Sequence, residues 1–364
     1  MTEIYLIRHA EAEGNIYRRA HGHFNGRITR RGAAQAEILS RRLSSVKFDA
    51  VYSSDLSRAR STAMPVCAAQ GLELVLTDQL REVDIGAWED VAWGNIMHEY
   101  PDTSELFNSD PARWSIDGSE KYEDVQTRMR DAIISIAKSH EGGTIAVFSH
   151  GFAIRAFLCA VLAIPSEEIE SVRYCDNTAI NLLKYDNDAI TVEYHGDNSH
   201  LNESSSSFAK QTWWRGAGKR LAEDLRYLPT DDTRDAAFLD GLPGGGGAGA
   251  TDAADAADAG KPARFTAFLE EETAGYLSFS SQDELYDKAC LIESLWIKPQ
   301  LRGRGFGLQL IGQAVCECRK RMMALMRVAI DSDDSQSALF LEKSGFTESG
   351  RNDKKRMFEM NISY

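Results

Sequence analysis

Two histidines and an arginine each follow a short apolar segment of the chain. Arg8 and His9 come directly after residues 4–7, and His150 follows residues 144–148 after one serine. Continuous apolar runs of this kind are typical of strands that are buried on both faces of a parallel sheet. Open parallel sheets bind ligands just beyond the carboxyl ends of their strands. The two imidazoles and the guanidinium are therefore expected to lie where such a fold places its chemistry.

A second arginine and a carboxylic acid complete a set that suits phosphate chemistry. Arg58 lies where a predicted strand runs into a helix, with Ser54 or Asp55 available as the N-cap, and Glu82 lies in a loop-like stretch. Arginine forks bind phosphate oxygens in pairs, and a neutral imidazole can attack phosphorus. A carboxylic acid can protonate the departing oxygen when its pKa is raised. These residue types therefore indicate phosphoryl transfer.

Four segments of the first half carry a resemblance to a known family. They are residues 8–11 with Asn15 after them, residues 54–63, residues 80–89 and residues 149–151. In this order and spacing, residues 1–203 resemble the histidine phosphatase superfamily, also called phosphoglycerate-mutase-like. The resemblance implies a three-layer α/β/α domain that uses neither a metal nor a cofactor.

The same resemblance implies a role for each residue of the set. His9 becomes the phosphorylated nucleophile, and Glu82 becomes the proton donor. The phosphoryl group is held by Arg8, Arg58 and His150, with Asn15 assisting. By contrast, Glu11 and Glu89 are expected to be solvated or secondary groups.

The family also contains mutases, which usually clamp the substrate carboxylate with an extra basic segment. After Glu82 this chain instead has mainly large apolar residues, and Arg113 is its main exposed cation; the apolar residues are Trp88, Trp93, Met97, Tyr100 and Trp114. This favours the small phosphatase branch, with an aromatic cap over the site. Residues 25–29 and 117–120 depart from the usual family pattern, which affects specificity more than activity.

Composition limits the classes of protein to consider. The 364 residues are 43% hydrophobic, enough for at least two cores. A net charge of −14 argues against a general nucleic-acid or anionic-membrane binder. The chain has no apolar run of transmembrane length, it begins directly in a predicted strand, and its six cysteines lack metal-binding spacing. We expect a reduced, cytoplasmic protein.

The second half has a separate motif. Residues 291–297 form a predicted strand, and residues 302–307, Arg-Gly-Arg-Gly-Phe-Gly, then open a helix that runs to about Met322. A glycine-rich turn at a helix N-terminus offers backbone N–H groups to an anion. A strand at 326–331 and a helix through 338–343 follow, before a closing strand near 356–362.

Residues 264–364 resemble the GNAT acyltransferase superfamily, an α+β fold, and residues 207–240 do so faintly. The resemblance implies acetyl-CoA as cofactor and an amine as acceptor. The pyrophosphate would lie on residues 301–307, and the predicted cofactor-binding set is Ile297, Arg302, Gly303, Arg304, Gly305, Phe306 and Gly307. Trp213 and Trp214 are assigned to its first strand.

Catalysis in this half depends on less specific signals. Leu341 occupies the position where many GNAT members have a tyrosine that protonates the leaving thiolate. Glu293, on the strand before the glycine turn, is the candidate general base for an attacking amine. The alternative is that Glu293 is a carboxylate on the solvated side of an edge.

The sequence thus predicts two domains, residues 1–203 and 207–364, with residues 241–262 as a glycine-, alanine- and aspartate-rich insertion or linker. The predicted function is hydrolysis of a small phosphorylated metabolite through phosphohistidine, together with N-acetyl transfer to an amine. The alternatives are a phosphatase regulated by a non-catalytic acyl-CoA-binding domain, and a mutase. The metabolite, the acceptor and the oligomeric state do not follow from the sequence.

Overall fold

The computed structural model describes residues 1–211, 223–242, 262–281 and 288–363. By its contacts the chain divides into two compact units. Unit 1 comprises residues 1–15, 20–91 and 99–221, and unit 2 comprises residues 16–19, 92–98 and 222–364. Trp213, Trp214 and most of the glycine-rich segment lie outside the described residues.

Unit 1 is built on a six-stranded mixed sheet in the order β3-β2-β4-β1-β5-β6. Its strands are β1 Thr2–Arg8, β2 Ala50–Ser54, β3 Leu74–Thr77, β4 Thr144–Ser149, β5 Ile180–Asp186 and β6 Ala189–Asp197. The first four are parallel, whereas β5 pairs antiparallel with β1, and β6 pairs antiparallel with β5. The carboxyl ends of β1, β2 and β4 therefore meet at one edge of the sheet.

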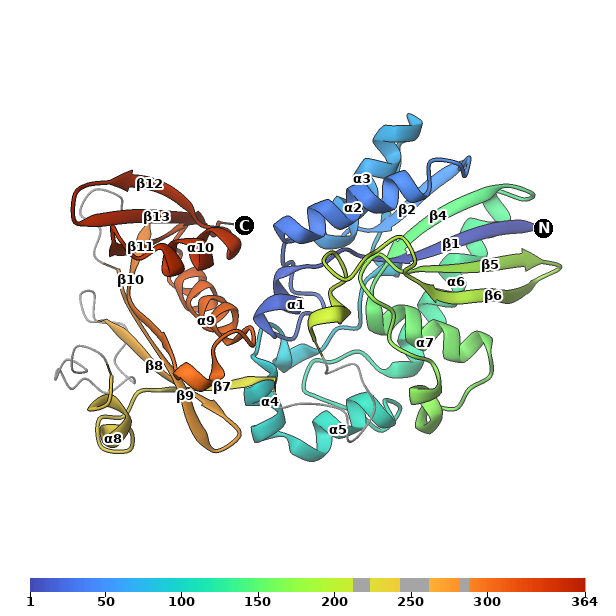
Figure 1. Ribbon diagram of the computed structural model, residues 1–364. Coiled ribbons are helices and arrows are strands. Elements are labelled where there is room, and N and C mark those ends of the chain that lie inside the picture. Colours follow the sequence, from blue (N-terminus) through green and yellow to red (C-terminus); the bar gives the residue numbers. More distant parts are fainter. Residues whose placement is uncertain (212–222, 243–261, 282–287, 364) are drawn as a thin grey trace. The chain divides into compact units, whose positions relative to one another are not determined.

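Helices cover both faces of this sheet (Figure 1). The pair α2 Arg30–Arg42 and α3 Ser57–Gln70 lies on one face, and the pair α6 Tyr122–Ser139 and α7 Gly151–Val161 lies on the other. Leu39 of α2, Leu43 directly after it and Val66 of α3 share one buried hydrophobic cluster with Val51 of β2 and Phe148 of β4. Three short helices lie in the connections: α5 Pro101–Ser109 belongs to unit 1, nearly all of α4 Trp93–Glu99 belongs to unit 2, and α1 Glu13–Tyr17 is divided between the units. The predicted three-layer α/β/α architecture is confirmed.

The helices α2 and α3 begin differently. Thr29 caps α2, because its side chain accepts from the N–H of Gly32. The prediction of Ser54 or Asp55 as the cap of α3 is wrong, since the N-cap is Leu56, which makes no side-chain cap bond. The Ser54 hydroxyl lies instead 2.8 Å from His150 Nε2.

Unit 2 contains a seven-stranded mixed sheet in the order β12-β13-β11-β10-β9-β8-β7. Its strands are β7 Leu225–Pro229, β8 Ala263–Leu269, β9 Glu272–Ser280, β10 Ala289–Ile297, β11 Leu325–Asp331, β12 Thr347–Arg351 and β13 Lys355–Asn361. Its helices are α8 Ala236–Leu239, α9 Phe306–Lys320 and α10 Ser335–Lys343. The predicted strands at 291–297, 326–331 and 356–362 are confirmed to within a few residues.

Only β10 and β11 pair in parallel in this sheet, and they do so over part of their length. Their register runs from Ala289 opposite Leu325 to Ile292 opposite Val328, although β10 continues to Ile297. The two strands therefore part beyond Ile292, next to the end of β10 that leads into the glycine-rich turn.

The strands also bear on the domain boundary and on the candidate linker. β7 and β8 are neighbours in one sheet, so the sequence on either side of residues 241–262 belongs to one fold. Ser206 and Ser207 lie with unit 1, because the Ser206 hydroxyl donates to Asp176 at 2.6 Å and the Ser207 hydroxyl donates to Glu11 at 3.0 Å. Unit 1 therefore continues past residue 203.

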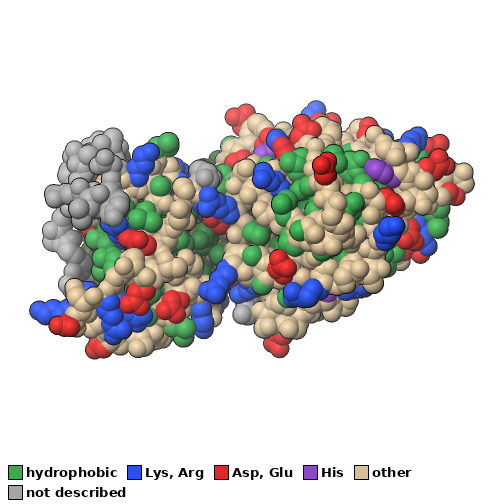
Figure 2. Space-filling model, turned by 90° about the horizontal axis from the view of Figure 1, so that it is seen from above, with side chains coloured by type: hydrophobic (Ala, Val, Ile, Leu, Met, Phe, Trp, Pro, Cys, Tyr) green, Lys and Arg blue, Asp and Glu red, His purple; other side chains and the backbone are tan. Residues whose placement is uncertain are grey.

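The surface and the thiols agree with the composition. Basic and acidic side chains are interspersed on the face seen in Figure 2. Within the described ranges no helix has the length and apolar character needed to cross a bilayer. All six cysteines are free thiols and are buried: Cys67, Cys159 and Cys175 in unit 1, and Cys290, Cys316 and Cys318 in unit 2.

Candidate active site

His9 lies directly beyond the carboxyl end of β1. The loop at 175–178, which leads into the neighbouring strand β5, fixes its backbone. The N–H of Thr178 donates to the carbonyl of Arg8 at 3.1 Å, and the Asn177 side-chain amide donates to the carbonyl of His9 at 2.9 Å. His9 Nδ1 lies 2.7 Å from the carbonyl of Ala10. Since a carbonyl only accepts, Nδ1 carries the proton and Nε2 carries the lone pair.

The surroundings of His9 keep its imidazole neutral. Burial, together with the charges of Arg58 and Arg8, holds the pKa of His9 well below its ordinary value. The ring of His150 lies 5.2 Å away, centroid to centroid. A neutral imidazole with one exposed lone pair is the form that can act as a nucleophile.

His150, beyond the carboxyl end of β4, has the opposite tautomer. Arg58 Nε donates to His150 Nδ1 at 3.1 Å, and a guanidinium only donates, so His150 Nδ1 carries the lone pair. His150 Nε2 then holds the proton and donates to the Ser54 hydroxyl. Burial, followed by the charges of Arg58 and His9, also holds the pKa of His150 well below its ordinary value.

Arg58 is only 2% exposed and is held by main-chain carbonyls. Its Nη1 donates to the carbonyl of Phe24 at 2.8 Å, and its Nη2 donates to the carbonyl of Gly22 at 2.7 Å. Burial lowers the pKa of Arg58 to about 10, and the carboxylates of Glu82 and Glu89 oppose that shift. The guanidinium therefore stays charged at neutral pH.

Arg8 has an unused donor. Its Nη1 donates to the carbonyl of Cys175, but its buried Nε has no hydrogen-bond partner among the described residues. An unpaired buried N–H of a cation is costly, and a bound anion would satisfy it. Among the other predicted residues, Arg58 hydrogen-bonds His150, whose ring lies beside that of His9. Asn15 reaches the same region through Asn177, whose side-chain amide donates to Asn15 Oδ1 at 3.4 Å.

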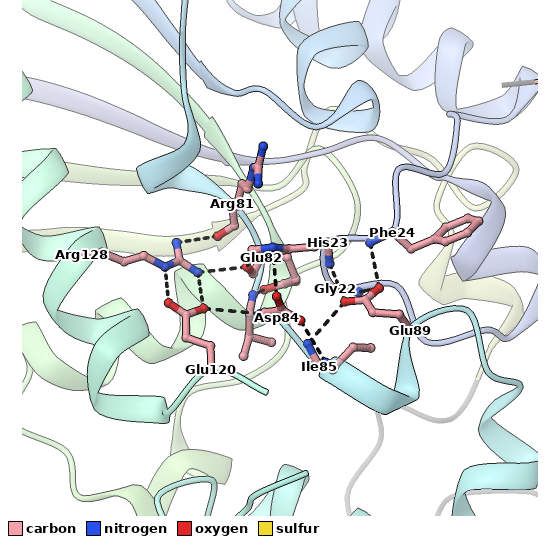
Figure 3. Close-up of polar contacts among 12 residues, drawn as sticks. Gly22, His23, Phe24, Arg81, Glu82, Asp84, Ile85, Glu89, Glu120 and Arg128 are labelled. Atoms are coloured by element: carbon pink, nitrogen blue, oxygen red, sulfur yellow. Dashed lines mark hydrogen bonds and ion pairs between the residues drawn. The ribbon is translucent and has the colours of Figure 1, made fainter. Parts of the chain in front are cut away.

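Glu82 lies in the predicted loop and accepts three backbone hydrogen bonds. Its donors are the N–H groups of Val83 at 3.1 Å, Phe152 at 3.0 Å and Ala153 at 2.7 Å, so the carboxylate caps the first turn of α7. The carbonyl of Glu82 accepts from Arg128 Nη2 at 2.9 Å, and Arg128 is paired with Glu120 at 2.6 Å (Figure 3). Glu82, the proton-donor candidate, is thus held at the N-terminus of α7, which begins directly after His150.

Glu11 and Glu89, which were expected to be solvated or secondary groups, each accept several hydrogen bonds, and Glu89 is partly buried. Glu11 is buried and accepts from Thr29, Arg31 and Ser207. Glu89 accepts from four backbone N–H groups, as Figure 3 shows. The loop at 175–178, which fixes Arg8 and His9, was also missed, and the polar run Asp176-Asn177-Thr178 was the signal that could have found it.

The aromatic residues expected to cap the site form a core instead. Trp88 and Trp114 are buried, with ring centroids 5.6 Å apart, and both contact Phe107. Phe107 stacks on Phe152, whose N–H bonds Glu82, so this core borders the carboxylate. Trp93 and Met97 fall in unit 2, and Tyr100 is partly exposed. Arg113 is exposed as expected, with 74% of its side chain accessible.

The glycine-rich turn of unit 2 has the open backbone that an anion site needs. Gly303 and Gly305 have φ of +79° and +90°, and a Cβ on either would meet no atom within 4 Å. α9 begins at the next residue, Phe306, and Arg302 Nε donates to the carbonyl of Ile297 at 3.1 Å. This accessible turn before a long helix fits a pyrophosphate. Gly307 differs, because its Cα packs against the ring of Phe340.

The catalytic candidates of unit 2 are less strongly placed. Glu293 is exposed and lies at an irregularity in the pairing of β10 with β9, between Ile292 and Ser294. Leu341, at the position of the family tyrosine, is buried in the core of unit 2. Catalysis by Glu293 therefore stays a prediction.

Comparisons with known proteins agree with both halves. A family model described as the histidine phosphatase superfamily (branch 1) matches residues 4–198, and one described as the acetyltransferase (GNAT) family matches residues 241–346. Phosphoserine phosphatase 1 of Hydrogenobacter thermophilus is 31% identical over 183 residues, which cover 50% of this chain and 86% of that protein. Phosphoglycerate mutase-like protein 4 of Arabidopsis thaliana is 34% identical over 210 residues, 56% of this chain and 88% of that protein.

A solved structure supports the same assignment for the first half. Bacillus stearothermophilus YhfR superposes with a TM-score of 0.54 and 30% identity, covering 56% of this chain and 100% of that protein. This chain therefore belongs to the histidine phosphatase superfamily, branch 1, and carries a GNAT-family acetyltransferase domain in its second half.

Proposed function

We propose that unit 1 hydrolyses the phosphomonoester of a small metabolite through a phosphohistidine. The observation that carries this proposal is the neutral His9, protonated on Nδ1, among two buried arginines. His9 Nε2 attacks phosphorus, and the bond from phosphorus to the ester oxygen breaks. Arg8, Arg58 and His150 hold the phosphoryl oxygens, with Asn15 assisting.

Glu82 completes both halves of the proposed cycle. The acid form of Glu82 gives its proton to the departing ester oxygen, so that an alcohol leaves. The resulting carboxylate then takes a proton from water as that water attacks the phosphohistidine. The products are inorganic phosphate and free His9, and no metal takes part.

Hydrolysis is favoured over a mutase reaction by the side chains around Glu82. The buried core of Trp88, Trp114 and Phe107 borders this carboxylate, and Arg113 is exposed. The relatives include proteins named for both reactions. The phosphoserine phosphatases among them make phosphorylated amino acids a first substrate class to test.

A phosphate-release screen tests this function. Purified protein is incubated with sugar, nucleotide, amino-acid and polyol phosphates, and inorganic phosphate is measured. We expect turnover on at least one class, together with an acid-labile phosphoenzyme that forms during turnover. A mutase would show little net phosphate release and would need a phosphorylated primer.

We propose that unit 2 transfers an acetyl group from acetyl-CoA to an amine. Acetyl-CoA supplies the thioester, Gly303 and Gly305 open the backbone N–H groups to its pyrophosphate, and Arg302, Arg304, Phe306, Gly307 and Ile297 line the same turn. Glu293 would take the amine proton, directly or through water, as the amine nitrogen bonds the acetyl carbon. The carbon–sulfur bond would break, and coenzyme A would leave as a thiol that takes its proton from solvent. The alternative is acyl-CoA binding without transfer, which regulates unit 1. Binding without thiol release across a broad amine panel would favour that alternative.

Acetyl-CoA binding to the full chain is expected to fall by about tenfold or more when Gly305 is replaced by valine. A side chain there must adopt a left-handed φ and fills the space left for the phosphate. Gly142→Val is the matched control, since Gly142 also has positive φ and open space but lies in unit 1. Calorimetry on both variants compares the affinities, and an unchanged affinity in Gly305→Val contradicts the site.

We further propose that the second domain starts upstream of β7 and that residues 241–262 are an insertion in it. A fragment of residues 207–364 is expected to be soluble and to bind acetyl-CoA. A fragment of residues 263–364 lacks β7, so β8 becomes an unpaired edge, and this fragment is expected to fail. Full binding by the shorter fragment would overturn the boundary.

A further inference from the structure

We propose that Glu89 is a positioning residue that sets the geometry of Arg58 by clamping the loop at 21–24. Glu89 accepts from three successive N–H groups of this loop: Gly22 at 3.2 Å, His23 at 2.6 Å and Phe24 at 2.7 Å (Figure 3). Consecutive N–H groups that converge on one carboxylate form an anion nest. One side chain therefore holds three successive N–H groups of this loop.

The other edge of the same loop holds Arg58. The carbonyls of Gly22 and Phe24 accept from the two terminal nitrogens of its guanidinium, at 2.7 and 2.8 Å. The peptide group between Gly22 and His23 thus lies between the Glu89 carboxylate on its N–H side and the Arg58 guanidinium on its C=O side, which aligns its dipole with both charges. If Glu89 releases the loop, Arg58 loses the acceptors that orient it.

Glu89 also joins this loop to the loop that carries Glu82. Its Oε1 accepts from the N–H of Ile85 at 3.3 Å, and His23 Nε2 lies 3.0 Å from the carbonyl of Glu82. Glu89 can approach this loop only because residue 22 is glycine. A Cβ at that position would collide with the Val83 carbonyl and with Glu89. One carboxylate therefore connects the phosphate-binding and proton-donor segments.

The negative charge of Glu89 stabilises the Arg58 guanidinium, in addition to the hydrogen bonds made through the loop. Arg58 is deeply buried, and the Glu89 carboxylate is among the charges that keep its guanidinium protonated. Glu89 itself follows the short turn Gly86–Trp88, whose Trp88 is buried, so the backbone that carries the carboxylate is fixed. Glu89 thus acts on the phosphate through Arg58, without touching it.

A double-mutant cycle tests this inference, which rests on the proposed role of Arg58 in phosphate binding. The variants are Glu89→Gln, Arg58→Ala and the double variant, and the readouts are inhibition by inorganic phosphate, kcat and KM. We expect Glu89→Gln to raise the phosphate inhibition constant by about tenfold in the wild-type background and by less than about twofold when Arg58 is already alanine.

Asp235→Asn is the control, because Asp235 is a buried carboxylate that fixes a loop of unit 2, where it accepts from the N–H of Asp231 and from the Thr266 hydroxyl. It is expected to lower thermal stability while leaving phosphate inhibition unchanged. If Glu89→Gln fails to fold, Glu89→Asp replaces it, since one methylene less withdraws the carboxylate from part of the nest.

The outcomes separate the two levels of the proposal. Additive effects of Glu89→Gln and Arg58→Ala would show a general structural role and overturn the inference about Glu89. An unchanged phosphate inhibition constant in Arg58→Ala would instead overturn the role of Arg58 in the proposed function. Strong coupling between the two positions supports the clamp.

Discussion

Replacing His9 with alanine is expected to abolish phosphomonoester hydrolysis, with a fall in kcat of roughly 10⁵-fold. His9 Nε2 has the free lone pair of the site, and no phosphohistidine can form without it. The fold should survive, because the removed ring makes one hydrogen bond, to the carbonyl of Ala10, and the expected loss is about 1–2 kcal/mol. Phosphate release and thermal unfolding measure the two effects.

The phosphoenzyme provides the decisive comparison. The wild type should trap acid-labile phosphate during turnover, and the His9 variant should trap none. His140→Ala serves as the matched control, since His140 bonds Tyr52 outside the site and should leave the rate unchanged. Full activity in the His9 variant, or wild-type activity lost on adding a chelator, would contradict the assignment.

Replacing Glu82 with glutamine is expected to slow phosphoenzyme formation by about 10²–10³-fold for alkyl phosphates and by less than about tenfold for an activated aryl phosphate. A basic alkoxide needs a proton as it leaves, whereas an activated phenolate leaves without one. Glutamine keeps one acceptor oxygen for the N–H groups of Phe152 and Ala153, so the cap of α7 is only weakened.

Pre-steady-state rates on the two substrate types test this role. The ratio of the alkyl loss to the aryl loss is the informative quantity, because damage to α7 would reduce both rates together. Equal losses on both substrates would show that Glu82 is not the acid. Circular dichroism of the variant checks that α7 remains folded.

The parts of the site that the sequence predicted are those fixed by strand ends. The position of a histidine directly after a buried strand is set by that strand. β1 and β4 are parallel neighbours, with Arg8 opposite Ser149 in their register. His9 and His150 therefore had to meet. Arg58, the second residue of the helix after β2, is carried to the same edge by the pairing of β2 with β4.

The parts that the sequence missed depend on contacts between loops distant in sequence. Glu11 and Glu89 belong to motifs but show no local sign of burial, and their partners come from segments such as 21–24 and 205–207. Ser54 satisfies the statistics of an N-cap, yet His150 takes its hydroxyl. Propensity describes local preference, and these residues are decided by long-range partners.

The six buried thiols can be used to measure the local stability of each unit. Three of them lie in unit 1 and three in unit 2, and each is shielded from solvent in the folded state. A thiol reagent can therefore modify a cysteine only after its surroundings open, and the labelling rate at each position reports the free energy of that opening. Mass spectrometry of the labelled peptides would thus rank the local stabilities of the two units in one sample, without any engineered label.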